Sequence, residues 1–138
     1  MVIDSSALIA ILLDEPDAGV LAAAIAADPD RYMSAFSLLE TSVVLDNRKG
    51  PEAVAELETL LADLGVRIIA LDAAQARTAR DAYRRFGKGR HPAGLNLGDC
   101  CSHALAITLG EPLLFKGNDF PRTDVPCMPV DKPSPRRL

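Results

Sequence analysis

The sequence predicts one three-layer α/β/α domain with a central, mainly parallel sheet. Its 138 residues suit a single domain that is large enough to bury a core. Short apolar runs alternate with longer segments of helical period, and strands separated by helices favour parallel pairing through right-handed crossovers. Apolar residues make up 49% of the chain and aromatic residues only 4%, which favours a helix-rich α/β fold over a β-sandwich.

The expected elements follow from these patterns in chain order. Short apolar runs predict strands at 1–3, 31–33, 66–71, 112–115 and 127–130, of which 66–71 is the clearest buried strand. Helical spacing of apolar residues predicts helices at 6–13, 17–27, 35–47, 51–64, 73–86 and 99–109. Pro51 suits the first position of a helix, where its missing N–H costs nothing, and Gly65 and Gly110 suit helix ends.

The domain is expected to span residues 1–130, followed by a flexible, Pro-rich basic tail at 131–138. The longest apolar stretches are shorter than the roughly 20 residues that cross a bilayer. Because the start lacks the features of a signal peptide, we expect a cytoplasmic protein. Cys100, Cys101 and Cys127 are odd in number and lack C-x-x-C spacing, so we expect reduced structural thiols. The net charge of −4 argues against a general nucleic-acid coat, although net charge does not describe local patches.

Four acidic residues fall where ligands gather in such a sheet, beyond the carboxyl ends of its strands. Asp4 directly follows the first strand, and Asp119 lies four residues after the apolar run at 113–115. Glu40 lies early in the helix after the second strand, and Asp99 begins a helix after a Gly-rich loop. Clustered carboxylates raise one another's pKa values unless cations keep them ionised, and oxygen-only ligands select Mg²⁺ or Mn²⁺. The pattern therefore predicts phosphoryl chemistry by a phosphodiesterase or a phosphatase.

Each of these acids also has a purely structural interpretation. Ser37 and Glu40 fit a helix capping box, and Asp99 fits an acid in the first turn of a helix. Asp119 fits ordinary turn chemistry. Asp4 is harder to explain in this way, because a carboxylate after a buried strand is costly unless a cation meets it.

The ordered set of acids resembles that of a PIN-domain ribonuclease of the VapC toxin type. The segments that carry the resemblance are "VIDSSAL", "SAFSLLET", "GLNLGDCCSHALA" and "LLFKGNDF", which together cover nearly the whole chain. The resemblance implies a PIN-like fold and a catalytic set of Asp4, Glu40, Asp99 and Asp119, with Asp4 and Asp99 as metal ligands. It also implies that Ser6 supports the first aspartate. Asp124 remains a nearby competitor for Asp119 as the fourth acid.

The same resemblance implies the cofactor and the partners. It implies an Mg²⁺-dependent endoribonuclease, with Mn²⁺ as an alternative ion, that cuts a structured RNA such as tRNA or rRNA. It further implies a cognate VapB-like antitoxin and a homodimer. Lys116 stands where a neutral residue is common in the family, and it could contact phosphate or point to solvent.

A basic helix face is the candidate RNA contact. Its members are Arg77, Arg80, Arg84 and Lys88, opposite the apolar residues of the same helix. A solvated helix face without a ligand is the alternative. The two histidines are not needed by a metal-dependent nuclease, and His103 lies on the same short helix as Cys100 and Cys101, which is a poor geometry for a Cys-His hydrolase.

Two other functions remain as alternatives. A haloacid-dehalogenase-like phosphatase also begins with an aspartate at the end of its first strand. However, Ser6 stands where that family places a second aspartate, and the chain has no room for a large cap domain. A non-catalytic PIN-like binding module is the other alternative, against which the presence of all four acids argues.

Overall fold

The computed structural model describes residues 1–131, and within that range the chain forms a four-stranded, all-parallel sheet with the order β3-β2-β1-β4. The strands are β1 (Val2–Ile3), β2 (Tyr32–Ser34), β3 (Arg67–Ile69) and β4 (Leu113–Leu114). The helices are α1 (Ser5–Leu12), α2 (Ala18–Ala27), α3 (Ala35–Lys49), α4 (Pro51–Asp63), α5 (Ala73–Phe86), α6 (Leu97–Leu109) and the 3₁₀ helix η1 (Phe120–Arg122). The predicted α/β class is confirmed.

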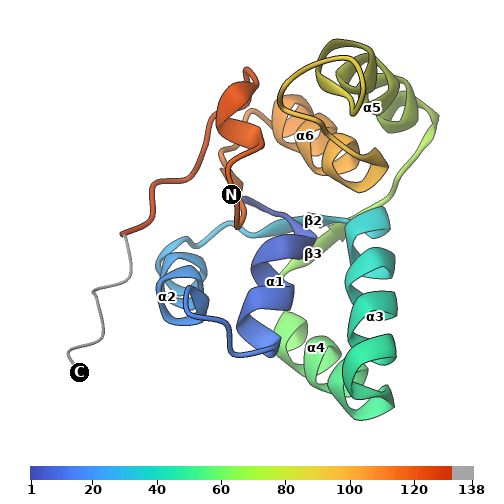
Figure 1. Ribbon diagram of the computed structural model, residues 1–138. Helices are drawn as coiled ribbons and strands as arrows, with labels where there is room; N and C mark the ends of the chain where they lie inside the picture. Colours follow the sequence, from blue (N-terminus) through green and yellow to red (C-terminus); the bar gives the residue numbers. More distant parts are fainter. Residues whose placement is uncertain (132–138) are drawn as a thin grey trace.

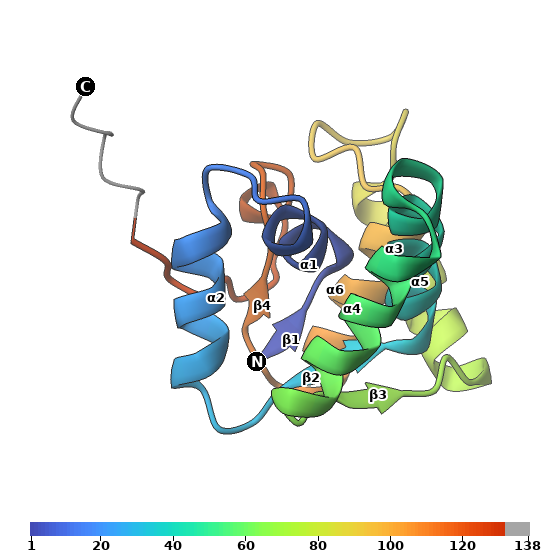
Figure 2. The same cartoon turned by 90° about the horizontal axis from the view of Figure 1, so that it is seen from below.

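Helices cover both faces of the sheet. α5 and α6 lie on one face, and α1 to α4 lie on the other (Figures 1 and 2). Side chains of β1 and β4 point alternately to the two faces of the sheet. Val2 and Leu113 pack with α5 and α6, whereas Ile3 and Leu114 pack with α1 to α4. Two apolar cores on either side of one sheet give the three-layer arrangement.

The strand order reverses at β1, and this reversal locates the site. β1 pairs with β2 on one side and with β4 on the other. The connections that lead to β2 and β3 run over the α1–α4 face, whereas the return to β4 runs over the opposite face. In such sheets the two sets of loops separate beyond the carboxyl ends of the central strands and leave a crevice there. Asp4 and the segment after β4 both begin at this point.

Two of the strand predictions are wrong in an informative way. The expected strand at 127–130 is reduced to one bridge between Leu113 and Cys127, because Pro126 and Pro129 on either side cannot donate to a ladder. The expected buried strand at 66–71 is the shorter β3, which pairs only with β2 and forms an edge of the sheet. Arg67 and Ile68 are accordingly exposed.

The remaining predicted elements agree with the structure to within two residues at each end. Asp131 is the last residue described, so the predicted tail lies almost wholly outside the described residues, and the domain boundary at residue 130 stays a prediction. Within residues 1–131, no helix has the length and apolar character needed to cross a membrane.

Candidate active site beyond strands β1 and β4

Asp4 is a buried carboxylate whose position is fixed by the first turn of α1. Its side chain is the N-cap of that helix, and the backbone N–H of Ser6 donates to Oδ2 at 3.0 Å. The hydroxyl of Ser102 on α6 donates to Oδ1 at 2.6 Å, and Ser102 lies 3.1 Å from the hydroxyl of Ser37 on α3. Asp4 is only 2% exposed, so these donors compensate for much of the cost of burying the carboxylate. Three elements thus hold the first acid.

Ser6 supports Asp4 through its backbone, not through its hydroxyl. The Ser6 hydroxyl instead accepts a hydrogen bond from the backbone N–H of Lys116 at 3.0 Å. This bond ties the start of α1 to the segment that follows β4. The side chain of Lys116 pairs with Glu15, which also raises the pKa of Lys116. Lys116 is therefore neither free in solvent nor directed at a phosphate site in this arrangement.

Glu40 is not a helix-capping residue. α3 begins three residues earlier than the capping-box pattern predicts, with Ser34 as its N-cap, so Glu40 lies in the second turn. The hydroxyl of Ser5 donates to Glu40 Oε1 at 2.6 Å. The carboxylate lies against the first turn of α6, where a Cβ atom on Gly98 would come within 2.6 Å of Oε1. Any other residue at this position would therefore force the Glu40 carboxylate to move.

Asp99 occupies the third position of α6 and completes a capping box. α6 begins at Leu97, two residues before the predicted start, because Asn96 is its N-cap. The Asn96 side chain accepts from the backbone N–H of Asp99 at 2.8 Å, and Asp99 Oδ2 accepts from the backbone N–H of Asn96 at 3.0 Å. Asp99 therefore has the predicted structural role of an acid in the first turn of α6.

The electrostatic environment of Asp99 differs from that of an ordinary capping acid. The pKa of Asp99 is raised to about 6, mainly by burial and also by the charges of Asp4, Glu40 and Asp119, whereas the hydrogen bond from Asn96 works to lower it. A capping acid at a helix N-terminus ordinarily gains from the helix dipole and has a low pKa. The other three predicted acids therefore lie near enough to Asp99 for their charges to act on it at this end of the sheet.

Of the two candidates for the fourth acid, Asp119 belongs to this group and Asp124 does not. Asp119 is exposed and immediately precedes η1. Asp124 instead accepts from Arg85 at 2.7 Å and lies 2.8 Å from His103 Nε2. Burial works to raise the pKa of Asp124, but the hydrogen bonds from Arg85 and His103 hold it below its ordinary value. Asp124 is thus paired with Arg85 and His103, and its charge is not among those that raise the pKa of Asp99.

The donor set fits a hard divalent cation. It consists of carboxylate oxygens, which Mg²⁺ and Mn²⁺ prefer, and each carboxylate keeps lone pairs beyond those used by its hydrogen bonds. Burial is the main cause of the raised pKa of Asp99, and the repulsion from the other three acids that adds to it is what a cation would relieve. Within residues 1–131, however, no three acidic, histidine or cysteine side chains converge as closely as a preformed metal site requires.

The cysteines on α6 are not suited to nucleophilic chemistry. Burial raises the pKa of Cys100 to about 12, and the nearby charge of Asp99 contributes in the same direction. Burial also raises the pKa of Cys101. Both thiols are therefore protonated at neutral pH, which makes them inert structural residues.

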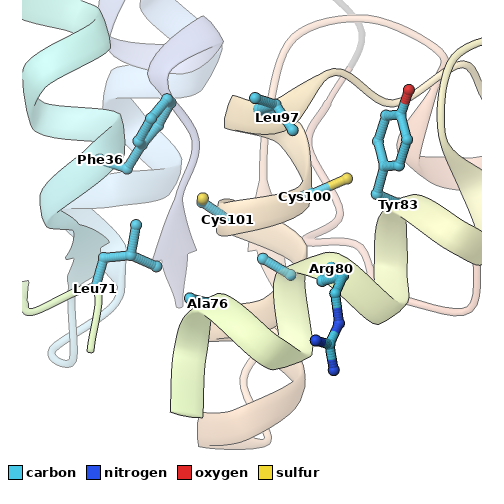
Figure 3. A pocket seen from close by; sticks show the side chains of 9 residues that line it. Phe36, Leu71, Ala76, Arg80, Tyr83, Leu97, Cys100 and Cys101 are labelled. Atoms are coloured by element: carbon cyan, nitrogen blue, oxygen red, sulfur yellow. The ribbon is translucent and has the colours of Figure 1, made fainter. Parts of the chain in front are cut away.

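The basic face of α5 is exposed beside an apolar hollow. Arg77, Arg80, Arg84 and Lys88 are all exposed. Arg80 and Tyr83 line a hollow of about 290 Å³ together with Leu97, the residue that begins α6 (Figure 3). The floor is formed by Cys100 and Cys101, and Leu97 is 66% exposed at its rim. Of the four cations, Arg80 is the one that lines this hollow.

Several residues of the site were not predicted from the sequence. Ser5, Ser102 and Gly98 position the acids through contacts between elements that lie far apart in the chain. Ser102 follows Asp99 by three residues and so shares its helix face, which is a signal that the sequence did contain. Asn96 and Asp99 also have the spacing of a capping box, and this pair forms one, whereas Ser37 and Glu40 do not.

Comparisons with known proteins identify the family of the chain. The family model for the PIN domain matches residues 1–126. Ribonuclease VapC of Mycolicibacterium smegmatis is 58% identical over 125 residues, covering 91% of this chain and 97% of that protein. Ribonuclease VapC30 of Mycobacterium tuberculosis is 54% identical over 125 residues, covering 91% of this chain and 95% of that protein. The chain belongs to the VapC family of PIN-domain ribonucleases.

A solved structure supports the fold. The crystal structure of Mycobacterium tuberculosis VapC20, described as a sarcin-ricin loop cleaving toxin, matches with a TM-score of 0.79 over 94% of this chain and 98% of that chain. At 18% sequence identity, this likeness concerns the fold alone. The family assignment confirms the expected ribonuclease class and sets aside the haloacid-dehalogenase-like phosphatase.

Proposed function

We propose that this chain is a divalent-cation-dependent endoribonuclease toxin and that Asp4, Glu40, Asp99 and Asp119 form its catalytic set. The observation that carries the proposal is the raised pKa of Asp99, to about 6, which the charges of the other three acids help to produce. These acids lie where the strand order of the sheet reverses. Grouped carboxylates without a basic partner repel one another and destabilise the cation-free protein, whereas a bound cation would relieve that repulsion.

In this proposal Asp4 and Asp99 hold the ion. Mg²⁺ or Mn²⁺, when bound, neutralises charge on the scissile phosphodiester and activates water. Asp4 is the rigid member, since Ser6 and Ser102 fix both of its oxygens. Glu40 and Asp119 complete the acidic rim from α3 and from the segment after β4.

The basic face of α5 is the proposed contact for the RNA backbone. Its four cations are exposed, and Arg80 lines the hollow whose rim carries Leu97, two residues before Asp99. A phosphate backbone that crosses this face would be held mainly by charge and would therefore bind in a salt-dependent manner. A solvated helix face predicts no such dependence.

The proposed substrate is a structured RNA such as tRNA or rRNA, and the proposed partner is a VapB-like antitoxin. Membership of the VapC family supports both proposals, and we propose a cytoplasmic location because such RNAs lie in the cytoplasm. We further propose a homodimer. Support comes from exposed apolar side chains on α3 and α6, among which Leu39 is 60% and Leu97 66% exposed.

Induced expression in bacteria tests the proposal. Cells that express the wild type should stop growing and accumulate one class of new RNA ends. Cells that express Asp4→Asn, which keeps an oxygen to cap α1, should do neither. Equal RNA ends in both cultures would show that the nuclease site is misplaced. Antitoxin binding by a wild type that leaves RNA intact would favour the non-catalytic binding module.

A further inference from the structure

We propose that Asp124, His103 and Arg85 form a clamp that positions Asp119 relative to Asp99. The inference rests on the proposed function, since it assigns a positioning role within the same site. Asp124 accepts from Arg85 Nη2 at 2.7 Å through Oδ2, and its Oδ1 lies 2.8 Å from His103 Nε2. One carboxylate thus joins α5, α6 and the segment after η1.

The spacing of the four residues along the chain gives the clamp its effect. His103 follows Asp99 by four residues on α6, so the two side chains share one face of the helix. Asp124 follows Asp119 by five residues, across η1. α6 and the segment after β4 therefore approach each other at two places. At the acidic site the like charges of Asp99 and Asp119 repel, and at the clamp His103 on α6 contacts Asp124. The clamp therefore opposes the separation of α6 from this segment that charge repulsion at the acidic site favours.

Asp119 depends on such a contact because it is exposed, and among residues 1–131 its side chain makes no hydrogen bond. Its place follows from the backbone after it. Its carbonyl accepts from Arg122 N at 3.1 Å, and Thr123 N and Oγ1 both donate to the carbonyl of Phe120. This compact turn transmits the position of Asp124 directly to Asp119.

The clamp includes a buried histidine whose presence is not explained by packing alone. His103 is 3% exposed, and its ring packs against Phe86 at 5.6 Å between centroids. Burial lowers the pKa of His103 despite the nearby carboxylate of Asp124, which favours a neutral ring that donates from Nε2. His103 Nδ1 is buried and has no hydrogen-bond partner among the described residues. An apolar side chain would avoid this cost, so packing alone does not account for histidine here.

The pair of Arg85 and Asp124 is too exposed to serve mainly for stability. The two side chains are 57% and 44% exposed, and ion pairs of that kind contribute little to folding. Asp124→Ala should therefore fold, which makes the clamp testable. Asp30→Ala is the matched control, since Asp30 forms an ion pair with Arg67 at 2.9 Å in which both side chains are about half exposed.

The test is a double-mutant cycle with two readouts: Mn²⁺ affinity by titration calorimetry with MnCl₂ alone, and the rate of cleavage of total bacterial RNA. Asp124→Ala should lower one or both by about tenfold, because the Asp119 carboxylate adds negative charge beside the proposed ligands Asp4 and Asp99 and depends on the clamp for its position. Asp30→Ala should change neither. When Asp119 is already replaced by asparagine, adding Asp124→Ala should cause no further loss, because the clamp acts through Asp119.

A second pair of variants guards against a general folding defect. His103→Gln keeps an N–H near the position of Nε2 and should retain both readouts, whereas His103→Leu removes the donor and should behave as Asp124→Ala does. Wild-type values for Asp124→Ala, or an equal loss with and without Asp119, would overturn the clamp alone. A wild-type chain that neither binds Mn²⁺ nor cleaves RNA would instead overturn the proposed function.

Discussion

Replacing Asp99 with asparagine should make the metal-free protein more stable while removing a group that the proposed reaction needs. The pKa of Asp99 rises from an ordinary 3.8 to about 6 on folding. Each pKa unit corresponds to about 1.4 kcal/mol, so the shift sets a ceiling of about 3 kcal/mol. Solvent screening at this partly exposed side chain lowers the expected gain to about 2 kcal/mol. The amide oxygen that Asp99→Asn introduces can still accept from the backbone N–H of Asn96.

The pH dependence of the effect identifies its cause. A folded-state pKa above the unfolded value means that the stability contributed by Asp99 is fully present below pH 3.8 and is lost as pH rises through about 6. Wild type and Asp99→Asn should therefore have similar stability near pH 4 and differ by about 2 kcal/mol at pH 7.5. For a chain of this size, that difference corresponds to a rise in Tm of roughly 8 °C.

Thermal unfolding in EDTA at pH 4, 6 and 7.5 measures the effect. Asp46→Asn is the control, since Asp46 is an exposed acid on α3. Added Mg²⁺ should stabilise the wild type more than Asp99→Asn, because the ion binds the folded state through that carboxylate. A lower Tm for Asp99→Asn at pH 7.5, or a difference that does not change with pH, would refute the reasoning.

Three further predictions concern positioning and RNA contact. Gly98→Ala should displace the Glu40 carboxylate and slow RNA cleavage by at least about tenfold, while thermal stability holds or rises because alanine favours helix. Ser102→Ala should cost about 1–2 kcal/mol in urea unfolding and slow cleavage, since it removes a donor to a buried carboxylate; unchanged values would contradict this role. Charge reversal at Arg80 and Arg84 should weaken RNA binding and flatten its salt dependence in filter-binding assays, and an unchanged slope would indicate a solvated face.

The sequence predicts the layer architecture well because its periodic signals are strong. α5 illustrates this, since Ala79, Ala82 and Phe86 are buried as their spacing predicts, and the basic residues face solvent. β3 illustrates the limit. Its apolar run predicts a buried strand, but whether a strand is central or at an edge depends on the strand order, which local patterns do not contain.

The positions of Asp4 and Asp99 could be predicted, because Asp4 directly follows a strand and Asp99 lies in the first turn of a helix, but the residues that support the acids could not. Ser5 and Glu40 are 35 residues apart, and Ser102 and Asp4 are 98 residues apart, so only the folded chain brings them together. The capping residues of α3 and α6 show a different limit, because several polar residues near each start could serve and backbone geometry decides among them.

The most direct test of the account is metal-dependent cleavage by the purified chain, with wild type and Asp4→Asn assayed side by side on total bacterial RNA. After EDTA treatment the wild type should leave the RNA intact, and added Mg²⁺ or Mn²⁺ should restore cleavage at discrete positions. Asp4→Asn should fold, because asparagine also caps a helix, and should stay inactive with either ion. Cleavage that persists in EDTA, or that Asp4→Asn retains, would contradict the proposal that these four acids form a cation-dependent ribonuclease site.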